Sequence, residues 1–263
     1  MTGDGHGPVL DLNCDLGEGD GPWRGGEPVA DEALLDLVTS ANVAAGFHGG
    51  DDATMLATCR AAAARGVVVG AHPSYRDREG FGRRRTDVAA HVLRADLVEQ
   101  LEALARHAAV AGTGVRYVKP HGALYHRVGH DPEQAGALVE AVLAVDRDLA
   151  VLAAPGSVVL DAAARAGLAV VAEAFADRGY RADGSLVPRG EPGALVGSPR
   201  RAGEQAVRLA TTGTVLAVDG TSVAVSARSV CVHSDTPGAV AVASAVRAAL
   251  TDAGVTLQPF RPR

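Results

Sequence analysis

Short apolar segments alternate with alanine-rich segments of helical pattern along most of this chain of 263 residues. The apolar segments lie at residues 9–12, 42–47, 67–71, 115–118, 150–153, 169–175 and 229–232. The helical patterns lie at 32–38, 53–64, 88–111, 132–145, 158–166 and 239–253. Strands that alternate with helices indicate parallel βαβ units. Because both faces of these strands read as buried, we predict an α/β fold, a distorted TIM-like (β/α) barrel of about seven parallel strands.

Helix boundary signals support this pattern. Asp131-Pro132 and Thr236-Pro237 each place a capping side chain before a proline at the first helical position. Asp51 is predicted to cap the helix that starts near residue 52. Three glycines are predicted to end helices just before a strand, namely Gly66, Gly112 and Gly167.

One region departs from the alternation. Residues 180–226 are rich in loops, with a predicted helix at 201–210 and a hairpin in "TVLAVDGTSVAVSA" around its Asp-Gly turn. We interpret this region as an insertion between the sixth and seventh strands. The prediction is therefore a single barrel domain over residues 1–263 with one loop-rich insertion at about 180–226.

Composition excludes several classes of protein. The net charge of -6 and pI near 5.8 argue against a nucleic-acid-binding surface. No run of about 18 apolar residues predicts a membrane span, and "MTGDGHGPV" lacks the features of a signal peptide. Three cysteines without CxxC spacing do not indicate a disulfide framework. We expect a cytoplasmic protein. The sequence does not determine the oligomeric state, and a homo-oligomer is one of the possibilities.

Polar side chains follow most of the predicted strands, where each strand ends. In chain order these candidates are Asp11, Asn13, Asp15, His48, His72, Lys119, His121, Glu173, Asp177, Arg178, His233 and Asp235. Active sites of such barrels lie at the C-terminal ends of the strands. Four of the nine histidines fall at this one edge. The sequence therefore predicts a shared polar pocket.

Structural roles remain open for individual residues. Asp15 or Glu18 could satisfy backbone amides in the glycine-rich turn, and any single strand-end histidine could be structural. The run Arg83–Arg85 is compatible with an anion site or with a solvated turn. The other histidines are assigned to a helix surface (His91 and His107) or to loops (His6, His126 and His130).

Histidine and aspartate are also metal ligands, so the pocket could hold zinc or manganese. The candidate ligands are His48, His72, His233 and Asp11. No HxH, HxxxH or HExxH motif places two ligands on one element, so each ligand would come from a different strand. The P-loop motif GxxxxGK[ST] is absent, which excludes ATP binding by that route.

Six motifs resemble the lactam-utilisation (LamB/YcsF) family, in order, between residues 9 and 255. They are "DLNCDLGEGDGPW", "VTSANVAAGFHGGDDATM", "GVVVGAHPSYRDREGFGRR", "VKPHGALYH", "EAFADRGYRADGSLVPR" and "CVHSDTP". The chain departs from the family pattern at Ala45, Gly49 and Ser234, where Cys, Ala and Gly are expected. Ser234 adds a hydroxyl beside His233.

The resemblance implies ATP-dependent opening of 5-oxo-L-proline to L-glutamate by an A subunit that works with subunits B and C. The implied fold is a TIM-like barrel of the glycoside hydrolase/deacetylase superfamily. ATP would be the co-substrate of the complex, and a divalent metal is possible. The missing P-loop fits an arrangement in which the partner subunits handle the nucleotide.

Roles follow for the candidate residues as hypotheses. Asp11 or Asp15 is the candidate general base, and His72 and His121 are candidate acid–base or oxyanion partners. Lys119 or Arg178 would hold the substrate carboxylate, and Asn13 would orient the lactam amide. The remaining members would complete the site or bind a metal, namely His48, Glu173, Asp177, His233 and Asp235.

Two other classes of function remain open. One is a metal-dependent deacetylase or amidohydrolase that acts without ATP, which metal analysis and chelator sensitivity would reveal. The other is a non-catalytic subunit that binds the lactam or scaffolds B and C.

Overall fold

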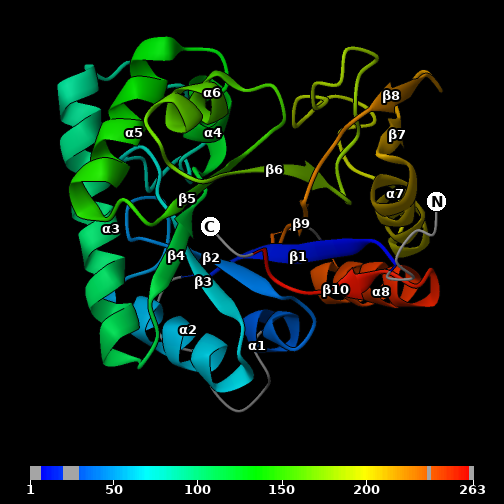
Figure 1. Ribbon diagram of the computed structural model, residues 1–263, viewed down its shortest axis with the longest axis horizontal. Helices are drawn as coiled ribbons and strands as arrows, with labels where there is room; N and C mark the ends of the chain where they lie inside the picture. Colours follow the sequence, from blue (N-terminus) through cyan, green and yellow to red (C-terminus); the bar gives the residue numbers. More distant parts are fainter. Residues whose placement is uncertain (1–6, 20–29, 236–237, 261–263) are drawn as a thin grey trace.

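The structure is a computed structural model that describes residues 7–19, 30–235 and 238–260. Its centre is a closed barrel of parallel strands (Figure 1), which confirms the predicted fold class. The order around the barrel is β1-β2-β3-β4-β5-β6-β9, and β9 pairs with β1 to close it. The strands are β1 (Val9–Leu16), β2 (Ser40–Ala44), β3 (Val68–His72), β4 (Val115–Val118), β5 (Ala150–Ala153), β6 (Val170–Phe175) and β9 (Ser229–Val232).

Helices surround this barrel, and a short strand β10 (Thr256–Leu257) extends the sheet beside the start of β1. The helices are α1 (Ala30–Leu35), α2 (Asp52–Arg65), α3 (Ala90–Val110), α4 (Gly122–Val128), α5 (Pro132–Val145), α6 (Val158–Arg165), α7 (Pro199–Thr212) and α8 (Ala239–Asp252). Within the described ranges, no helix is both long enough and apolar enough to cross a membrane.

The helix ends follow the predicted capping chemistry. The Asp51 carboxylate accepts a hydrogen bond from the backbone amide of Thr54 at 2.7 Å. Asp131, just before Pro132, accepts hydrogen bonds from the backbone amides of Glu133 and Gln134 in the first turn of α5. Gly66 adopts the left-handed conformation (φ 68°) that ends α2. The predicted cap Thr236-Pro237 lies outside the described residues.

Four elements differ from the sequence prediction, and one of them is β2, which spans Ser40–Ala44 and not residues 42–47. Strand β1 continues to Leu16 instead of ending at residue 12. Helix α4 and strand β10 were not predicted, because both are short and α4 begins at a glycine. As a result, His126 lies on a helix and not in a loop.

The segment between β6 and β9 holds α7 and an antiparallel pair, β7 (Thr214–Leu216) and β8 (Ser222–Ala224). This pair confirms the predicted hairpin. Tyr180 bridges to Leu186 within the preceding loop and to Ala217 just after β7. We retain the prediction of one domain with an insertion here.

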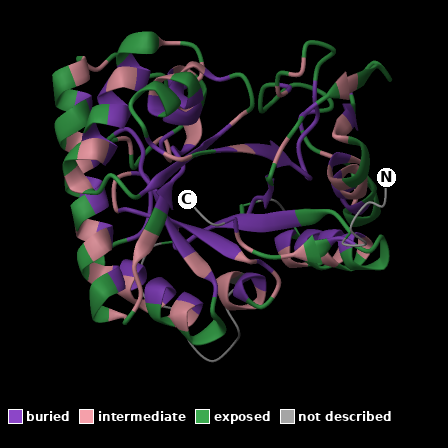
Figure 2. Ribbon diagram, viewed as in Figure 1, coloured by how far each residue is buried: buried purple, intermediate pink, exposed green. Residues whose placement is uncertain are grey.

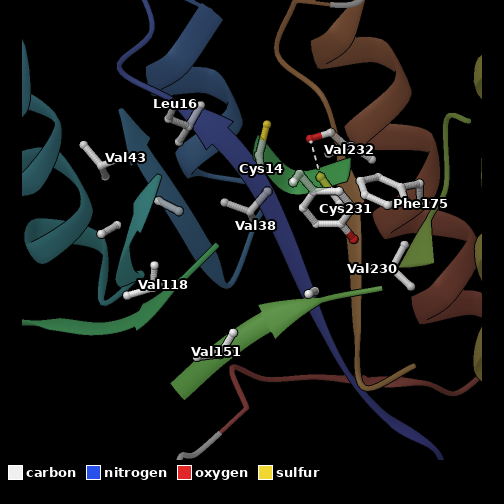
Figure 3. Packing of buried hydrophobic residues seen from close by; sticks show 14 of the residues in the cluster. Cys14, Leu16, Val38, Val43, Val118, Val151, Phe175, Val230, Cys231 and Val232 are labelled. Carbon is white, nitrogen blue, oxygen red and sulfur yellow. Dashed lines mark hydrogen bonds between the residues drawn. The ribbon is translucent and has the colours of Figure 1, made fainter. Parts of the chain in front are cut away.

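Apolar side chains hold the helices against the barrel. Strand and helix residues form one continuous apolar cluster, and Figure 3 shows members of it from several strands, including Cys14, Val43, Val118, Val151 and Val230. Figure 2 shows the same strands as the most buried part of the molecule.

The barrel interior, by contrast, carries polar side chains along β1, beside a second, smaller apolar cluster that includes Tyr117, Leu152 and Val171. Alternate residues of β1 point to opposite sides, so Leu12 and Cys14 join the apolar cluster while Asp11, Asn13 and Asp15 face inward. These three residues bond to side chains from β2, β6 and β9 and to Lys119 after β4. Only an interior position allows partners from so many strands.

Gly70 on β3 makes room for one of the interior side chains. A Cβ atom at Gly70 would lie 2.2 Å from the ring of Tyr117 on β4. The Tyr117 hydroxyl donates to Asn42 Oδ1 at 2.6 Å, which ties β4 to β2 across this position. The absence of a side chain at residue 70 therefore lets an aromatic ring fill the barrel.

Candidate active site

Asp11 lies deepest among the predicted site residues. Its carboxylate accepts hydrogen bonds from the hydroxyls of Thr39 (2.7 Å), Ser40 (2.6 Å) and Ser229, and the residue is fully buried. Burial raises its pKa to about 6, while the three hydroxyls oppose that rise. Asp11 lines neither of the cavities described below. The structure thus differs from the expectation that Asp11 acts as a general base, because its oxygens are occupied within the barrel.

Asn13 occupies the next level of the interior. Its amide donates to Ser229 Oγ at 2.6 Å, and its oxygen accepts from Asn42 Nδ2 at 2.7 Å. Asn42 also donates to Asp15 Oδ1 at 2.7 Å. Asn13 does not reach either cavity. The predicted contact with a lactam amide therefore has no support in this geometry, and Asn13 instead holds the network beneath Asp15.

Lys119 joins the interior network to the mouth of the barrel. Its ammonium lies 3.0 Å from Asp15 Oδ1, 3.2 Å from Glu173 Oε2 and 3.0 Å from Cys231 Sγ. Burial alone would lower the pKa of Lys119, but Asp15 and its other partners hold it well above the usual value. Because carboxylates of the protein already pair with this ammonium, it is poorly placed to bind a substrate carboxylate as predicted.

Above Asp15, four side chains from four different strand ends converge. Glu18, His48, His72 and His121 each offer a ligand atom, and these atoms lie within 4.8 Å of one another. Glu18 Oε1 is 3.2 Å from His48 Nε2, 3.2 Å from His121 Nδ1 and 3.9 Å from His72 Nε2. The rings of His48 and His121 stack with centroids 3.8 Å apart. We call these four residues the histidine–glutamate cluster.

Backbone carbonyls fix the protonation of two rings. His72 Nδ1 lies 2.7 Å from the carbonyl oxygen of Lys119, and His121 Nε2 lies 2.8 Å from that of Phe81. A carbonyl only accepts, so both of these nitrogens carry hydrogen. The opposite nitrogens, His72 Nε2 and His121 Nδ1, face each other at 3.0 Å. A proton or a metal cation must separate them, since two lone pairs repel.

The pKa shifts of the cluster show which of its groups favour a proton and which disfavour it. Burial lowers the pKa of His72, but the Asp15 carboxylate raises it further, with a net rise. Burial lowers the pKa of His48 to about 4 and also lowers that of His121. Burial would raise the pKa of Glu18, yet bonds to His121 and His48 bring it down. The cluster therefore combines two imidazoles of lowered pKa, His48 and His121, with His72, whose pKa Asp15 raises, and the Glu18 carboxylate; three imidazoles and a carboxylate are a donor set of divalent metal sites.

The loop at Gly80-Phe81-Gly82 covers this cluster. Phe81 has a positive φ of 54°, an uncommon conformation outside glycine, and its ring packs edge-on against His48 and His121. A Cβ atom at Gly82 would lie 2.8 Å from His121 and 2.9 Å from His48. Glycine at this position therefore allows the loop to press on the histidines and exclude water.

His233 and Asp177 form a separate pair on the other side of Asp15. The Asp177 carboxylate lies 2.9 Å from His233 Nδ1 and also accepts from the His233 backbone amide at 3.1 Å. Burial would raise the pKa of Asp177, but His233 lowers it overall. The pair leaves His233 Nε2 available for proton transfer, since Asp177 orients the ring through Nδ1.

Two adjoining cavities open at this end of the barrel. The main cavity, of about 40 Å³, is lined by Asp15, His72, Lys119, His121 and His233, together with Arg83, Arg178 and Arg189. The side cavity, of about 370 Å³, is lined by Ser157, Glu173 and Tyr180 among others. Both cavities share four residues, namely Tyr125, His126, Phe175 and Leu186.

Arginines mark the rim of the main cavity. Arg83 and Arg189 both pair with the carboxylate of Asp235, the latter at 3.6 Å, which places Asp235 between them. Arg178 donates to the backbone carbonyls of Ala194 (3.0 Å) and Val187 (2.6 Å), so it also holds the overlying loop. Three guanidinium groups against one carboxylate leave the rim positive.

The predicted metal-ligand candidates do not all lie together. His48 and His72 join the cluster, but Asp11 lies below it, and His233 groups with Asp15 and Cys231 instead. His121 was predicted as an acid–base residue, and Glu18 was assigned to a turn. The turn amide of Gly17 is satisfied by Asp31 at 2.8 Å, which leaves Glu18 free to reach the histidines. Glu18 lies two residues after the end of β1 and continues the run of acidic residues that begins at Asp11. This position after a strand end is the sequence feature that could have identified it as a site residue.

The fold and the site together define a (β/α) barrel enzyme whose C-terminal mouth gathers histidine and carboxylate side chains that could hold a metal ion. The profile of the LamB/YcsF family matches residues 10–263, and the chain belongs to that family.

Relatives agree along nearly the whole chain. The chain is 57% identical over 251 residues to the 5-oxoprolinase A subunit of Mycobacterium avium (strain 104), covering 95% of this chain and 98% of the relative. It is 54% identical to the protein of the same name from Streptomyces avermitilis, covering 96% and 100%. The crystal structure of a lactam utilization protein from Thermus thermophilus superposes with a TM-score of 0.88 at 43% identity, covering 96% and 100%.

Proposed function

We propose that this chain is the A subunit of an ATP-dependent 5-oxoprolinase that opens 5-oxo-L-proline to L-glutamate together with subunits B and C. The observation that carries the proposal is the meeting of the histidine–glutamate cluster, Asp15 and the Asp177–His233 pair around one small cavity. Relatives at 54–57% identity that bear the name of the 5-oxoprolinase A subunit support the substrate.

Glu18, His48, His72 and His121 would hold a divalent metal ion such as zinc or manganese. Three imidazoles and a carboxylate suit either ion, and the facing lone pairs of His72 and His121 fit a cation between them. When bound, the ion would polarise the lactam carbonyl. This assignment replaces the acid–base roles predicted for His72 and His121, because backbone carbonyls already occupy one nitrogen of each ring.

Proton transfer falls to the residues that border the main cavity. Asp15 is the candidate base for the attacking water, because it lines the cavity while Asp11 does not. Its position between Lys119 and His72 fixes its orientation. His233, oriented by Asp177, is the candidate acid that protonates the ring nitrogen as the C–N bond breaks.

The arginine rim supplies the positive potential for the substrate carboxylate. Arg83, Arg178 and Arg189 line the main cavity, and a guanidinium can bind a carboxylate in bidentate fashion. We assign this role to the rim and not to Lys119, whose ammonium pairs with Asp15 and Glu173.

ATP would act on the complex and not on this chain alone. The sequence lacks a P-loop, so this chain has no nucleotide site of that kind. We therefore propose that subunits B and C bind ATP and activate the lactam. The three buried free thiols support a cytoplasmic location.

The test is ATP-coupled release of glutamate from 5-oxoproline by the three purified subunits. Omission of this chain should abolish release, and His72→Ala should lower it at least about 100-fold, as expected for loss of a metal ligand. His91→Ala on α3 is the matched control, because His91 is exposed and should leave turnover unchanged. Near-normal turnover in His72→Ala would contradict the proposal.

A second candidate is a metal-dependent deacetylase or amidohydrolase that needs no ATP. The histidine–glutamate cluster beside an Asp–His pair favours it. This function predicts chelator-sensitive hydrolysis of small amides by the isolated chain, and the absence of such activity would leave the oxoprolinase.

A further inference from the structure

The side cavity extends away from the histidine–glutamate cluster and carries an unusual set of polar atoms. It lies between the C-terminal ends of β5 and β6, helix α4 and the loop at residues 183–186. Its volume of about 370 Å³ exceeds that of the main cavity several times over. A small molecule held at the main cavity would therefore extend into this space, because the two cavities share walls.

Three buried oxygens at the side cavity lack a hydrogen-bond partner among the described residues. They are Glu173 Oε1, Ser157 Oγ and Tyr125 Oη, on residues that are 1%, 6% and 9% exposed. The other Glu173 oxygen pairs with Lys119, so Oε1 is the remaining acceptor. Burial raises the pKa of both Tyr125 and Glu173, and a weak hydrogen-bonding interaction between the two side chains contributes to both shifts, although the two oxygens do not meet in full hydrogen-bond geometry. Buried polar atoms without partners are costly, and they mark places where a ligand supplies the missing bond.

The position of Ser157 also suggests that its hydroxyl is available to a ligand. It occupies the N-cap position of α6, where a serine side chain ordinarily accepts from a backbone amide. Here the side chain makes no capping bond. The hydroxyl is thus not used by the helix.

The charge of the side cavity is opposite to that of the main cavity. The residues that line it include Glu173 and Asp183 but no lysine or arginine, whereas three arginines line the main cavity. Burial and nearby arginines lower the pKa of His126, so this ring is neutral at pH 7. The rings of Tyr125, Phe175 and Tyr180 complete a wall that suits a cation.

We propose that the side cavity binds the α-ammonium group of L-glutamate, the group that ring opening creates from the lactam nitrogen. This proposal rests on the proposed function. In the hydrolysis, water adds oxygen to the carbonyl carbon and the C–N bond breaks. The nitrogen gains one hydrogen from water and one from the new carboxylic acid, giving an ammonium and a carboxylate. An ammonium has three donors, and the cavity offers three buried oxygens without a full hydrogen-bond partner, two of which, on Tyr125 and Glu173, interact with each other.

The test compares L-glutamate with glutarate, which has the same two carboxylates but no amino group. Calorimetric titration of the full-length protein should show L-glutamate binding at least about tenfold more tightly, one charge-assisted hydrogen bond being worth that much. Glu173→Gln keeps the shape and removes the charge, so it should abolish this preference and leave glutarate affinity within about twofold.

Glu173→Gln also removes the ion pair with Lys119, so two milder variants are needed to test the side cavity separately from that ion pair. Tyr125→Phe and Ser157→Ala each remove one hydroxyl and keep the Lys119 pair, and each should reduce the preference about threefold. Equal affinity of the wild type for both ligands would overturn the proposal, as would equal loss of both ligands in all variants.

Turnover of the reconstituted complex separates this result from the proposed function. Normal 5-oxoproline turnover with no preference for L-glutamate overturns the side-cavity proposal alone. A clear preference without turnover overturns the proposed function and supports the side cavity as an amine site.

Discussion

Two polar regions of the barrel, its lower interior and its mouth, differ in how their polar atoms are satisfied. In the lower part, Asp11, Asn13, Asn42 and Ser229 bond to one another and to the hydroxyls of neighbouring strands. At the mouth, His48 Nδ1, Tyr125 Oη, Ser157 Oγ and Glu173 Oε1 have no partner. Of the five such buried atoms in the described ranges, only Thr58 on α2 lies elsewhere. Satisfied groups hold a structure together, whereas unsatisfied ones await a ligand.

Asn13→Ala disrupts the hydrogen-bond network of the lower interior and should have the largest effect on stability. It removes one hydrogen bond each from Asn42 and Ser229, which keep their bonds to Asp15 and Asp11, and each polar atom left unpaired in the closed interior costs about 1–3 kcal/mol. We expect a loss of about 4 kcal/mol in the free energy of unfolding, measured by urea denaturation. Thr211→Ala on the exposed face of α7 is the control. A loss below about 1 kcal/mol would show that the lower network is dispensable.

The pH dependence of stability sharpens the same comparison through Asp11. Its folded pKa of about 6 exceeds the unfolded value near 3.8, so the folded state holds the proton more tightly. The resulting stabilisation is complete below the unfolded pKa and is lost as pH rises through 6. Between pH 4 and pH 7 the wild type should lose on the order of 3 kcal/mol relative to Asp11→Asn.

Denaturation of both proteins across that pH range measures the difference. Asp183→Asn, at an exposed loop position, should follow the wild type and serves as the control. Parallel pH profiles for Asp11→Asn and the wild type would mean that Asp11 is not held protonated by the barrel.

Glu18→Gln tests the mouth, where function is expected to suffer and stability is not. The substitution removes the only carboxylate of the histidine–glutamate cluster. We expect zinc or manganese affinity to fall at least about 100-fold, while the metal-free protein unfolds within about 1 kcal/mol of the wild type. Metal titration and thermal unfolding report the two quantities. Glu191→Gln is the matched control, because Glu191 forms a surface pair with Arg181. Unchanged metal affinity in Glu18→Gln would contradict the assignment of the metal site to this cluster.

Ser234→Gly should have the smallest effect. The Ser234 hydroxyl reaches Glu18 Oε2 at 3.4 Å, a long bond at a partly exposed position, where the family pattern has glycine. We expect metal affinity and turnover within about twofold of the wild type. A larger change would mean that this residue tunes the cluster from outside it.

Much of the fold could be predicted from the alternation of apolar and alanine-rich segments, because parallel strands need covering helices. The same reasoning failed where elements are short. Helix α4 has only seven residues and starts at Gly122, so its pattern resembles a loop. The end of β1 was placed too early because inward-facing Asn13 and Asp15 look like loop residues.

The sequence predicted which residues gather at the site, but not how deep in the barrel each of them lies. Strand ends gave His48, His72, His121 and His233 correctly as neighbours of one mouth. The depth of Asp11 could not be predicted, because its level along β1 depends on the register with β9, where it lies beside Ser229. Ser157 could not be found, because a serine before a helix ordinarily indicates a cap and nothing more.

Anomalous diffraction from crystals of the protein grown with manganese or zinc tests the central claim most directly. The account predicts one ion at the mouth of the barrel, within about 2.0–2.2 Å of ligand atoms from the histidine–glutamate cluster. An ion bound only elsewhere, or a fully loaded crystal with none at these four side chains, would contradict it.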